Sequence, residues 1–161
     1  MTARAGVPMT ETLLLAVWIG AALLFTVVVA PAAFSVLPTR TLAGVLVGRV
    51  LPVIFYAGVV IGSLIVILDL VSRTGTWART AAGALAALAC AVAQLVVGTR
   101  IERLRDAIGG PLDALAGDDP RRIAFGRLHA ISVGWLGIAM LAAIIALTLA
   151  VRASVPRQSA P

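Results

Sequence analysis

The chain has 161 residues, of which 61% are hydrophobic and only 12% are charged, and its formal net charge is +6. Average proteins hold about 45–50% apolar and about 25% charged residues, so a water-soluble domain of this composition would expose large apolar patches and aggregate. Composition therefore excludes a soluble enzyme, a disordered segment and a disulfide-rich secreted module. It predicts an all-α, polytopic membrane protein.

The positive charge comes entirely from arginine, and it lies between the apolar runs rather than on one polar face. A nucleic-acid-binding surface would gather its cations on one face, interleaved with aromatic residues. We therefore expect the arginines to flank membrane helices, with a lipid bilayer and no nucleic acid as partner. The single cysteine, Cys90, lies inside an apolar run, and we expect it to be a small buried residue.

Four apolar runs are each long enough to cross a membrane, which takes about 20 helical residues. A lone strand is excluded because its backbone could not be satisfied in lipid. We therefore expect a single domain, a four-helix transmembrane bundle with both termini on one side. The predicted spans are about 12–37, 42–71, 79–100 and 127–152, with an extramembrane helical hairpin at 101–126.

Two prolines fall within the first two spans. Ala30-Pro31 is expected to break the first helix near the far interface, as a kink or turn, because proline has no N–H to donate. Pro38-Thr39 is typical of a turn followed by a helix start. The second helix is expected to continue from there through a bend at Pro52.

The segment between the third and fourth spans has a helical pattern of its own. Apolar residues recur at helical spacing among charged ones in 101–108, which predicts that the third helix extends beyond the bilayer. Asp118 or Asp119 ahead of Pro120 is typical of a helix start. The fourth helix is therefore expected to run unbroken from this point through His129.

The distribution of arginine suggests an orientation. Eight arginines lie on the side of the 101–126 segment and five on the side of the termini. Basic residues are enriched on the cytoplasmic side of membrane proteins. We therefore expect a bacterial inner (cytoplasmic) membrane protein whose 101–126 segment is cytoplasmic and whose termini lie on the outer side.

Small residues recur every four positions, a pattern that lets membrane helices approach closely. Packing within the bundle is the main interpretation, and self-association is the alternative. The repeats are Gly44 and Gly48; Gly58 and Gly62; Gly83, Ala87 and Ala91; and Gly126, Ala130 and Gly134.

The only histidine, His129, is the first member of a candidate polar site. It shares a helix face with Phe125 and Ser132, so we expect it to face the bundle and to hydrogen-bond near Ala30-Pro31 or near Arg49. The alternative is a haem or metal ligand, or a proton carrier.

Four other polar residues complete the candidate site. Ser132 and Arg127 lie beside His129 in sequence, and Arg49 stands where the second helix enters lipid, either reaching headgroups or turning inward. Gln94 lies deepest in an apolar run, where an interhelical hydrogen bond is its ordinary role. Outside this site, Asp69 is expected to pair with Arg73 one helical turn later.

No arrangement of residues indicates catalysis, a phosphate loop or a metal centre. We therefore expect a non-enzymatic protein with no cofactor. Three functions remain open, in this order. The first is a small scaffold or accessory subunit that packs with itself or within a larger membrane complex. The second is a haem- or metal-handling protein that uses His129. The third is a resistance or transport factor for small solutes.

Two blocks of sequence support a family resemblance. The first block holds Ala30, Pro31, Phe34, Leu37, Ala43, Gly44 and Gly48. The second holds an arginine-rich stretch after the third span, with Arg100, Ile101, Arg103, Leu104 and Arg105, followed by Phe125, Leu128, His129 and Ser132. With these blocks the chain resembles a bacterial domain family similar to eukaryotic transmembrane protein 205. This resemblance implies a four-helix integral membrane protein with no settled activity, and its vertebrate member is associated with resistance to platinum drugs.

Overall fold

The computed structural model describes residues 6–72 and 75–154, and within these ranges the regular structure is entirely helical. Four long helical rods follow one another along the chain, and two of them contain a π-helical segment. The elements are α1 (Gly6–Leu24), η1 (Phe25–Val29), α2 (Ala30–Val36), α3 (Arg40–Ser72), α4 (Trp77–Ala91), η2 (Val92–Gly98), α5 (Thr99–Ile108), η3 (Leu112–Ala114) and α6 (Pro120–Ser154).

Each rod is long and apolar enough to cross a membrane, which makes this a multi-pass membrane protein. Each spans at least 28 residues, with a mean hydropathy of 2.0 or more over its most apolar stretch. The expected all-α four-helix bundle is therefore confirmed. The four candidate spans are Met9–Val36, Arg40–Ser72, Trp77–Ile108 and Pro120–Ala153.

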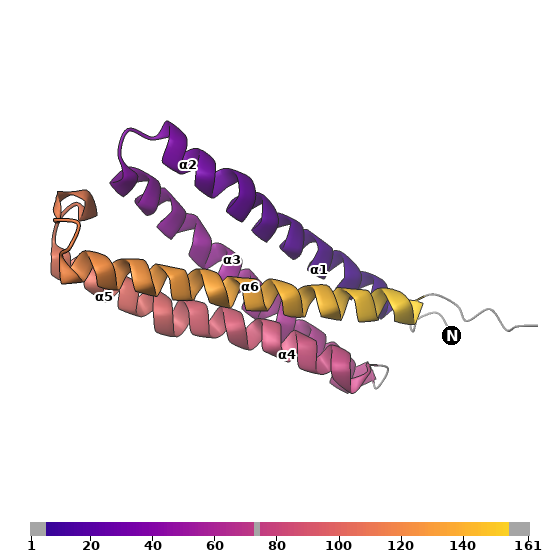
Figure 1. Cartoon of the computed structure of the whole chain (residues 1–161). Coiled ribbons are helices and arrows are strands. Elements are labelled where there is room, and N and C mark those ends of the chain that lie inside the picture. The colour runs from indigo at the N-terminus through magenta and orange to yellow at the C-terminus, as the bar shows by residue number, and fades with distance from the viewer. Residues whose placement is uncertain (1–5, 73–74, 155–161) are drawn as a thin grey trace, which may run out of the picture.

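The four rods form a ring in which each rod packs against the next one in the sequence and the fourth packs against the first. α1 lies against both α3 and α6, and α4 packs against α3 and α6. We call the end where α1 begins and α6 ends the terminus end, and the opposite end the hairpin end (Figure 1). Toward the hairpin end, α2 and the start of α3 diverge from α5 and α6.

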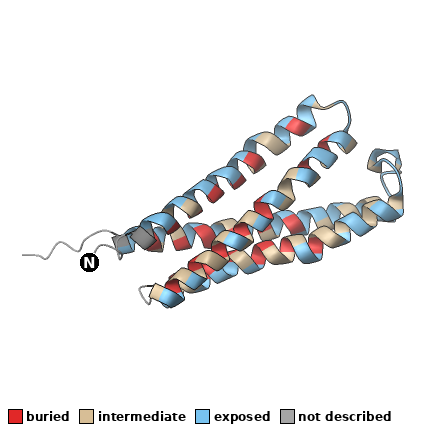
Figure 2. Ribbon diagram, turned by 180° about the vertical axis from the view of Figure 1, so that it is seen from behind, coloured by how far each residue is buried: buried red, intermediate tan, exposed pale blue. Residues whose placement is uncertain are grey.

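The core follows the inner faces of the rods and is built largely from alanine (Figure 2). Small side chains let helices approach closely in a membrane, where packing rather than hydrophobicity drives association. The largest inward residue of α1 is Trp18, whose indole N–H donates to the carbonyl oxygen of Ile54 over 2.9 Å. Cys90 is fully buried beside it, as expected.

Glycines confirm part of the expected packing. An added Cβ at Gly58 would lie 2.5 Å from the Cys90 sulfur, and one at Gly62 would lie 2.7 Å from the Gly83 carbonyl oxygen. The repeat on the fourth rod is different: an added Cβ at Gly126 or Gly134 would meet no atom within 4 Å. The expectation that these two glycines draw in a neighbouring helix of the same bundle is therefore wrong.

The first rod does not turn at Pro31. The helix widens into the π segment η1 directly before Ala30-Pro31, and the Ala30 N–H donates to the carbonyl oxygen of Phe25, five residues back. This shift of register accommodates the missing proline N–H while the chain stays helical to Val36. The α-helical hydrogen-bond ladder is therefore interrupted near Pro31, as expected, but by a π segment and without a turn, and α3 runs continuously through Pro52.

The connection between α5 and α6 folds back over the start of α3. α5 ends at Gly109, whose φ of 65° lies in the left-handed region that favours glycine. Asp113 then accepts hydrogen bonds from the backbone and hydroxyl of Thr41, both over 2.9 Å. This connection is thereby joined to the second rod as well as to its own two helices.

The start of α6 agrees with the predicted cap. The Asp119 carboxylate accepts from the backbone N–H of Arg121 over 2.8 Å and pairs with its guanidinium. These contacts lower the pKa of Asp119, chiefly through the side-chain hydrogen bond. From Pro120 the helix continues without a gap through His129 to Ser154, which confirms the expectation for the fourth helix.

Candidate functional site

The hairpin end holds a group of polar side chains centred on Arg105 of α5. Its guanidinium reaches across to α3 and donates to the carbonyl oxygen of Gly44 over 3.1 Å. It also lies over the ring of Phe125 on α6, 5.3 Å from the ring centroid, a favourable cation–π geometry. Arg105 thus joins three of the rods.

Glycine makes this reach possible. An added Cβ at Gly48 would lie 2.8 Å from Nη1 of Arg105, closer than real Cβ contacts come, whereas one at Gly44 would lie at an ordinary 3.7 Å from Nη2. One turn after Gly48, Pro52 lacks the N–H that would otherwise bond the Gly48 carbonyl. The face of α3 opposite Arg105 therefore has two residues without side chains, and the carbonyl oxygen of Gly48 is left free to accept a hydrogen bond.

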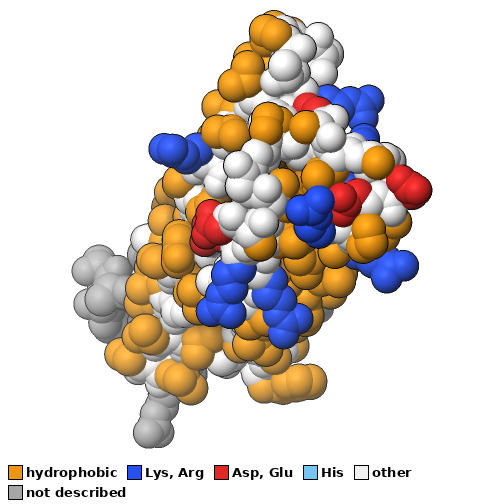
Figure 3. Space-filling model, turned by 90° about the vertical axis from the view of Figure 1, so that its left-hand side faces the viewer, with side chains coloured by type: hydrophobic (Ala, Val, Ile, Leu, Met, Phe, Trp, Pro, Cys, Tyr) orange, Lys and Arg blue, Asp and Glu red, His pale blue; other side chains and the backbone are white. Residues whose placement is uncertain are grey.

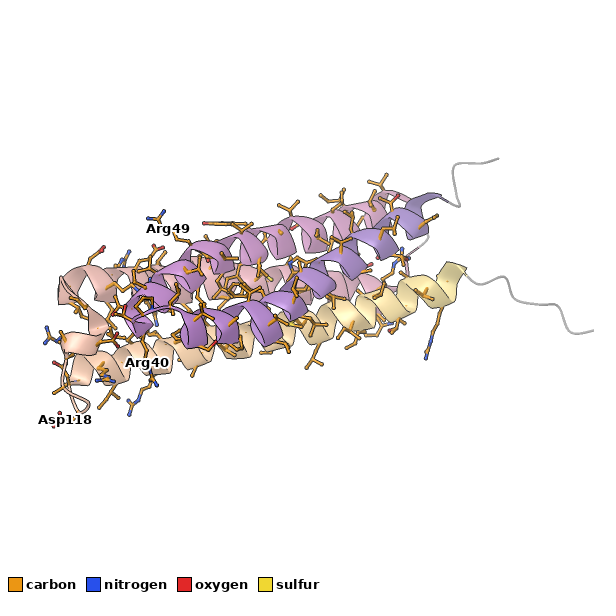
Figure 4. The ribbon with its side chains drawn as sticks, turned by 90° about the horizontal axis from the view of Figure 1, so that it is seen from above. Arg40, Arg49 and Asp118 are labelled. Carbon is orange, nitrogen blue, oxygen red and sulfur yellow. The ribbon has the colours of Figure 1, made fainter. Side chains whose placement is uncertain are left out.

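His129 lies one turn beyond Phe125, and the two rings stack with an interplanar angle of 2° and a centroid separation of 6.5 Å. The imidazole remains exposed, and it makes no hydrogen bond to any other described residue. The expected bond to Ala30-Pro31 or to Arg49 is therefore not formed. Arg49 lies on the outer surface of α3 and extends away from the bundle (Figure 4).

Three adjoining cavities surround these residues. The first, of about 120 Å³, lies between α3, η2, α5 and α6 and is bordered by Arg105, Gln94 and Glu102 as well as His129 and Ser132. Gln94 is half-buried and contributes a polar wall. It makes no hydrogen bond to another described residue, so its predicted interhelical bond is absent.

The second cavity lies under the hairpin and is strongly basic. It has a volume of about 290 Å³, and its wall includes Arg40, Arg105 and Arg122, with Asp113 as the one acidic residue. Asp113 is already bonded to Thr41. The arginines on this end of the molecule are visible among apolar surface in Figure 3.

The third cavity is apolar. It also measures about 290 Å³ and lies where the first rod diverges from α6, with walls from Phe25, Pro31, Leu51 and Leu136. The three cavities share walls. Arg105, Phe125 and Gly44 border the first and second; His129, Ser132, Val47 and Leu51 border the first and third; and Phe34 borders the second and third.

The residues singled out from the sequence divide into two groups. Those of the candidate polar site that border the cavities are His129, Ser132 and Gln94, while Arg49 and Arg127 are exposed on outer surfaces. Among the residues that carry the resemblance, Ala30, Pro31, Phe34, Gly44, Phe125 and His129 border a cavity. Ala43 is buried, and Leu37 and Leu128 are half-buried away from these cavities.

Sequence reasoning placed Arg105 in the arginine-rich block of the resemblance but not in the candidate polar site, because its partners lie on other helices. It also missed a second cluster at the terminus end, where Asp69 binds Arg79 through two hydrogen bonds and the Arg79 guanidinium faces Glu11. The expected pairing of Asp69 with Arg73 lies outside the described residues, and the contacts that the structure describes for Asp69 are with Arg79 and Thr80 of α4. The sequence did contain a signal for this cluster. Glu11 lies near the start of the first span, Asp69 near the end of the second and Arg79 near the start of the third, so helices that alternate in direction bring all three to the same end of the bundle.

A haem or metal role for His129 was left open by the sequence. Within residues 6–72 and 75–154, no three His, Cys, Asp or Glu side chains come together as a metal site requires. The exposed imidazole of His129 instead stacks on Phe125 and borders the first cavity.

The chain belongs to the family described as Domain of unknown function (DUF4149), whose sequence profile matches residues 13–109. The match begins in α1 and ends at the glycine that terminates α5, so it includes Arg105 and the glycines of α3 but not α6. No curated protein and no solved structure matches the chain.

Proposed function

We propose that this protein is a non-enzymatic membrane protein that binds an amphipathic molecule with an acidic head group at the hairpin end. The observation that carries the proposal is the second cavity, where three arginines and one already bonded aspartate form the charged wall. A site of this charge attracts carboxylate or phosphate, and arginine binds both through its planar fork of donors.

Arg105 is the residue that we assign to the head group. It is half-buried, and no carboxylate lies within ion-pair distance of it among the described residues. A partly buried cation without a counter-ion is costly, and its hydrogen bond to Gly44 uses only one of five N–H donors. An anionic head group would supply the missing charge.

The third cavity supplies a place for the tail. Phe34 borders both the basic and the apolar cavity, so a ligand with its head group near Arg105 extends from there between Pro31 and Leu136. This proposal develops the third function left open by the sequence, a resistance or transport factor for small solutes, and assigns the solute an acidic head group and an apolar tail. The resemblance to transmembrane protein 205 remains a hypothesis, and several residues that carry it border these cavities.

The test is a titration of the detergent-purified chain with a fluorescent fatty acid and with the corresponding fatty alcohol. We expect the acid to bind more tightly, and Arg105→Gln to weaken acid binding by about tenfold to a hundredfold, since a charge-assisted hydrogen bond contributes about 1.5–3 kcal/mol. Arg103→Gln is the matched control, because Arg103 is exposed on the same helix. Equal affinities for acid and alcohol, or an unchanged affinity in Arg105→Gln, would contradict the proposal.

The outward glycines of α6 favour a second function, the scaffold or accessory subunit. Gly126 and Gly134 leave open space on the outer surface of the rod, and Ala130 between them is exposed. Such a face suits close packing with a helix of a second copy or of a larger complex. Gly134→Leu should then reduce cross-linked dimer in membranes, and Gly20→Leu, at an equally open position on α1, should not.

We further propose that the chain lies in the bacterial inner membrane with the hairpin end in the cytoplasm and the termini outside. The excess of arginine on the hairpin side supports this orientation. Reporter fusions after Arg40 and Asp118 should report the cytoplasm, and fusions after Thr76 and Arg157 the outer side. Two consecutive fusion sites on the same side would refute the arrangement.

A further inference from the structure

The terminus end contains a carboxylate with no hydrogen-bond partner. Glu11 of α1 is 0% exposed, and neither of its side-chain oxygens accepts a hydrogen bond. Its nearest charged neighbour is Arg79 of α4, whose Nη1 lies 3.4 Å from Oε2. This site lies at the opposite end of the bundle from the cavities and is independent of the function proposed for them.

Arg79 is already committed to another acid. Its Nε donates to Oδ2 of Asp69 over 3.1 Å, and its Nη2 contacts Oδ1. Asp69 also accepts from the hydroxyl of Thr80 over 2.9 Å. Asp69 and Arg79 are each only 4% exposed, and together they form a satisfied, neutral pair.

Glu11 therefore adds a second carboxylate to a pair that is already neutral. With all three groups ionised, the cluster would hold two carboxylates and one guanidinium out of contact with water, and an uncompensated buried charge is very costly. Among the residues that the structure describes, the charged groups that face Glu11 are Asp69 from α3 and Arg79 from α4. In the part of α6 at this end, the charged residue is Arg152, which is exposed.

We propose that Glu11 is a proton-binding site, a neutral carboxylic acid while α1 is packed against the Asp69–Arg79 pair. A proton balances the charge and needs no volume. A hydrated cation is disfavoured because Glu11 is fully buried and none of the three cavities described above borders it. Ionisation of Glu11 favours movement of the start of α1 toward water, so proton binding is coupled to closure of this end of the bundle.

The first test is infrared spectroscopy of the full chain in lipid at neutral pH. A protonated carboxylic acid has a carbonyl stretching band that a carboxylate lacks, and the difference spectrum of wild type minus Glu11→Gln should contain it. Glu102→Gln is the matched control, because Glu102 is the chain's other glutamate and is exposed. If the difference spectrum shows a carboxylate band for Glu11 instead, the proposal is wrong.

The second test is the pH dependence of stability. The folded chain keeps a proton on Glu11 that the unfolded chain releases above about pH 4.3. The folding equilibrium constant of the wild type should therefore fall by up to about tenfold per pH unit between about pH 6 and pH 8, relative to Glu11→Gln. Parallel profiles would overturn the proposal. Failure of Glu11→Gln to fold would overturn it too, because the amide is a neutral substitute of the same size.

Discussion

The guanidinium of Arg105 donates a hydrogen bond to the carbonyl of Gly44, 61 residues earlier in the chain. This bond links α5, the last part of the third rod, to the start of α3. It also positions a cation at the boundary of the first two cavities. One side chain therefore contributes both to the packing of the hairpin end and to the charge of the proposed site.

Gly48→Ala should impair ligand binding more than stability. The added Cβ would lie 2.8 Å from the end of the Arg105 side chain, which is flexible enough to move away, so the loss is about one hydrogen bond, roughly 0.5–1.5 kcal/mol. Titration with the fluorescent fatty acid and thermal melting in detergent measure the two effects. Gly44→Ala is the control, since its Cβ would make an ordinary contact at 3.7 Å. Unchanged acid binding in Gly48→Ala would show that this glycine does not position Arg105.

Gly62→Ala should destabilise the bundle itself. Its Cβ would lie 2.7 Å from the Gly83 carbonyl oxygen, and a backbone atom cannot move away without separating α3 from α4. We expect a cost of about 1–3 kcal/mol, the usual penalty of overpacking, measured by unfolding in detergent. Gly20→Ala, in open space on α1, should be neutral or slightly stabilising. Equal melting temperatures for the two variants would disagree with the close approach of α3 and α4.

Local signals in the sequence were sufficient to predict the rods and their ends. The four spans follow from uninterrupted apolar length, and the start of α6 follows from Asp119-Pro120, where the capping residue and its partner are two positions apart. The register shift before Pro31 was not predictable in this way. The same proline is compatible with a kink, a turn or a π segment, and packing against the other rods decides between them.

The sites were less predictable, because their residues meet across helices. Arg105 was one arginine among many until the fold brought it to Gly44 and Phe125. The sequence placed His129 on the same helix face as Phe125, and the two rings stack, but the imidazole is exposed and makes no hydrogen bond to a backbone group of the first rod. Helical periodicity predicts which face of a helix a side chain occupies, but not which residue of a neighbouring helix lies opposite it.

Asp119 should make the start of α6 sensitive to acid. Arg121 lowers the pKa of the Asp119 carboxyl in the folded chain. The ionised cap therefore stabilises the helix fully while the pH is above the ordinary pKa of aspartate. This stabilisation is lost as the pH falls through the lowered pKa of the folded chain. Hydrogen exchange of the Arg121 amide should therefore accelerate in Asp119→Ala at neutral pH, and in the wild type only in strong acid. Asp118→Ala is the control, since Asp118 lies at the exposed tip of the connection (Figure 4). Equal exchange in both variants would argue against the cap.

Arg79→Met should be among the most destabilising substitutions in the chain. It leaves the buried carboxylate of Asp69 with the Thr80 hydroxyl but no cation, and breaking a buried pair from one side costs about 3–5 kcal/mol. Unfolding in detergent measures this loss, and Arg127→Met, at an exposed position on α6, should change stability by about 0.5 kcal/mol or less.

The double variant Asp69→Leu with Arg79→Met separates the contribution of charge to stability at this site from the contribution of side-chain packing. Replacing both partners of a buried pair by apolar residues of similar volume is often neutral or stabilising, so the double variant should recover most of the stability that Arg79→Met loses. Glu11 would then face apolar neighbours alone, which its neutral form tolerates better than an ionised one. A double variant as unstable as Arg79→Met would mean that the cost comes from lost packing around Asp69 rather than from an unpaired charge.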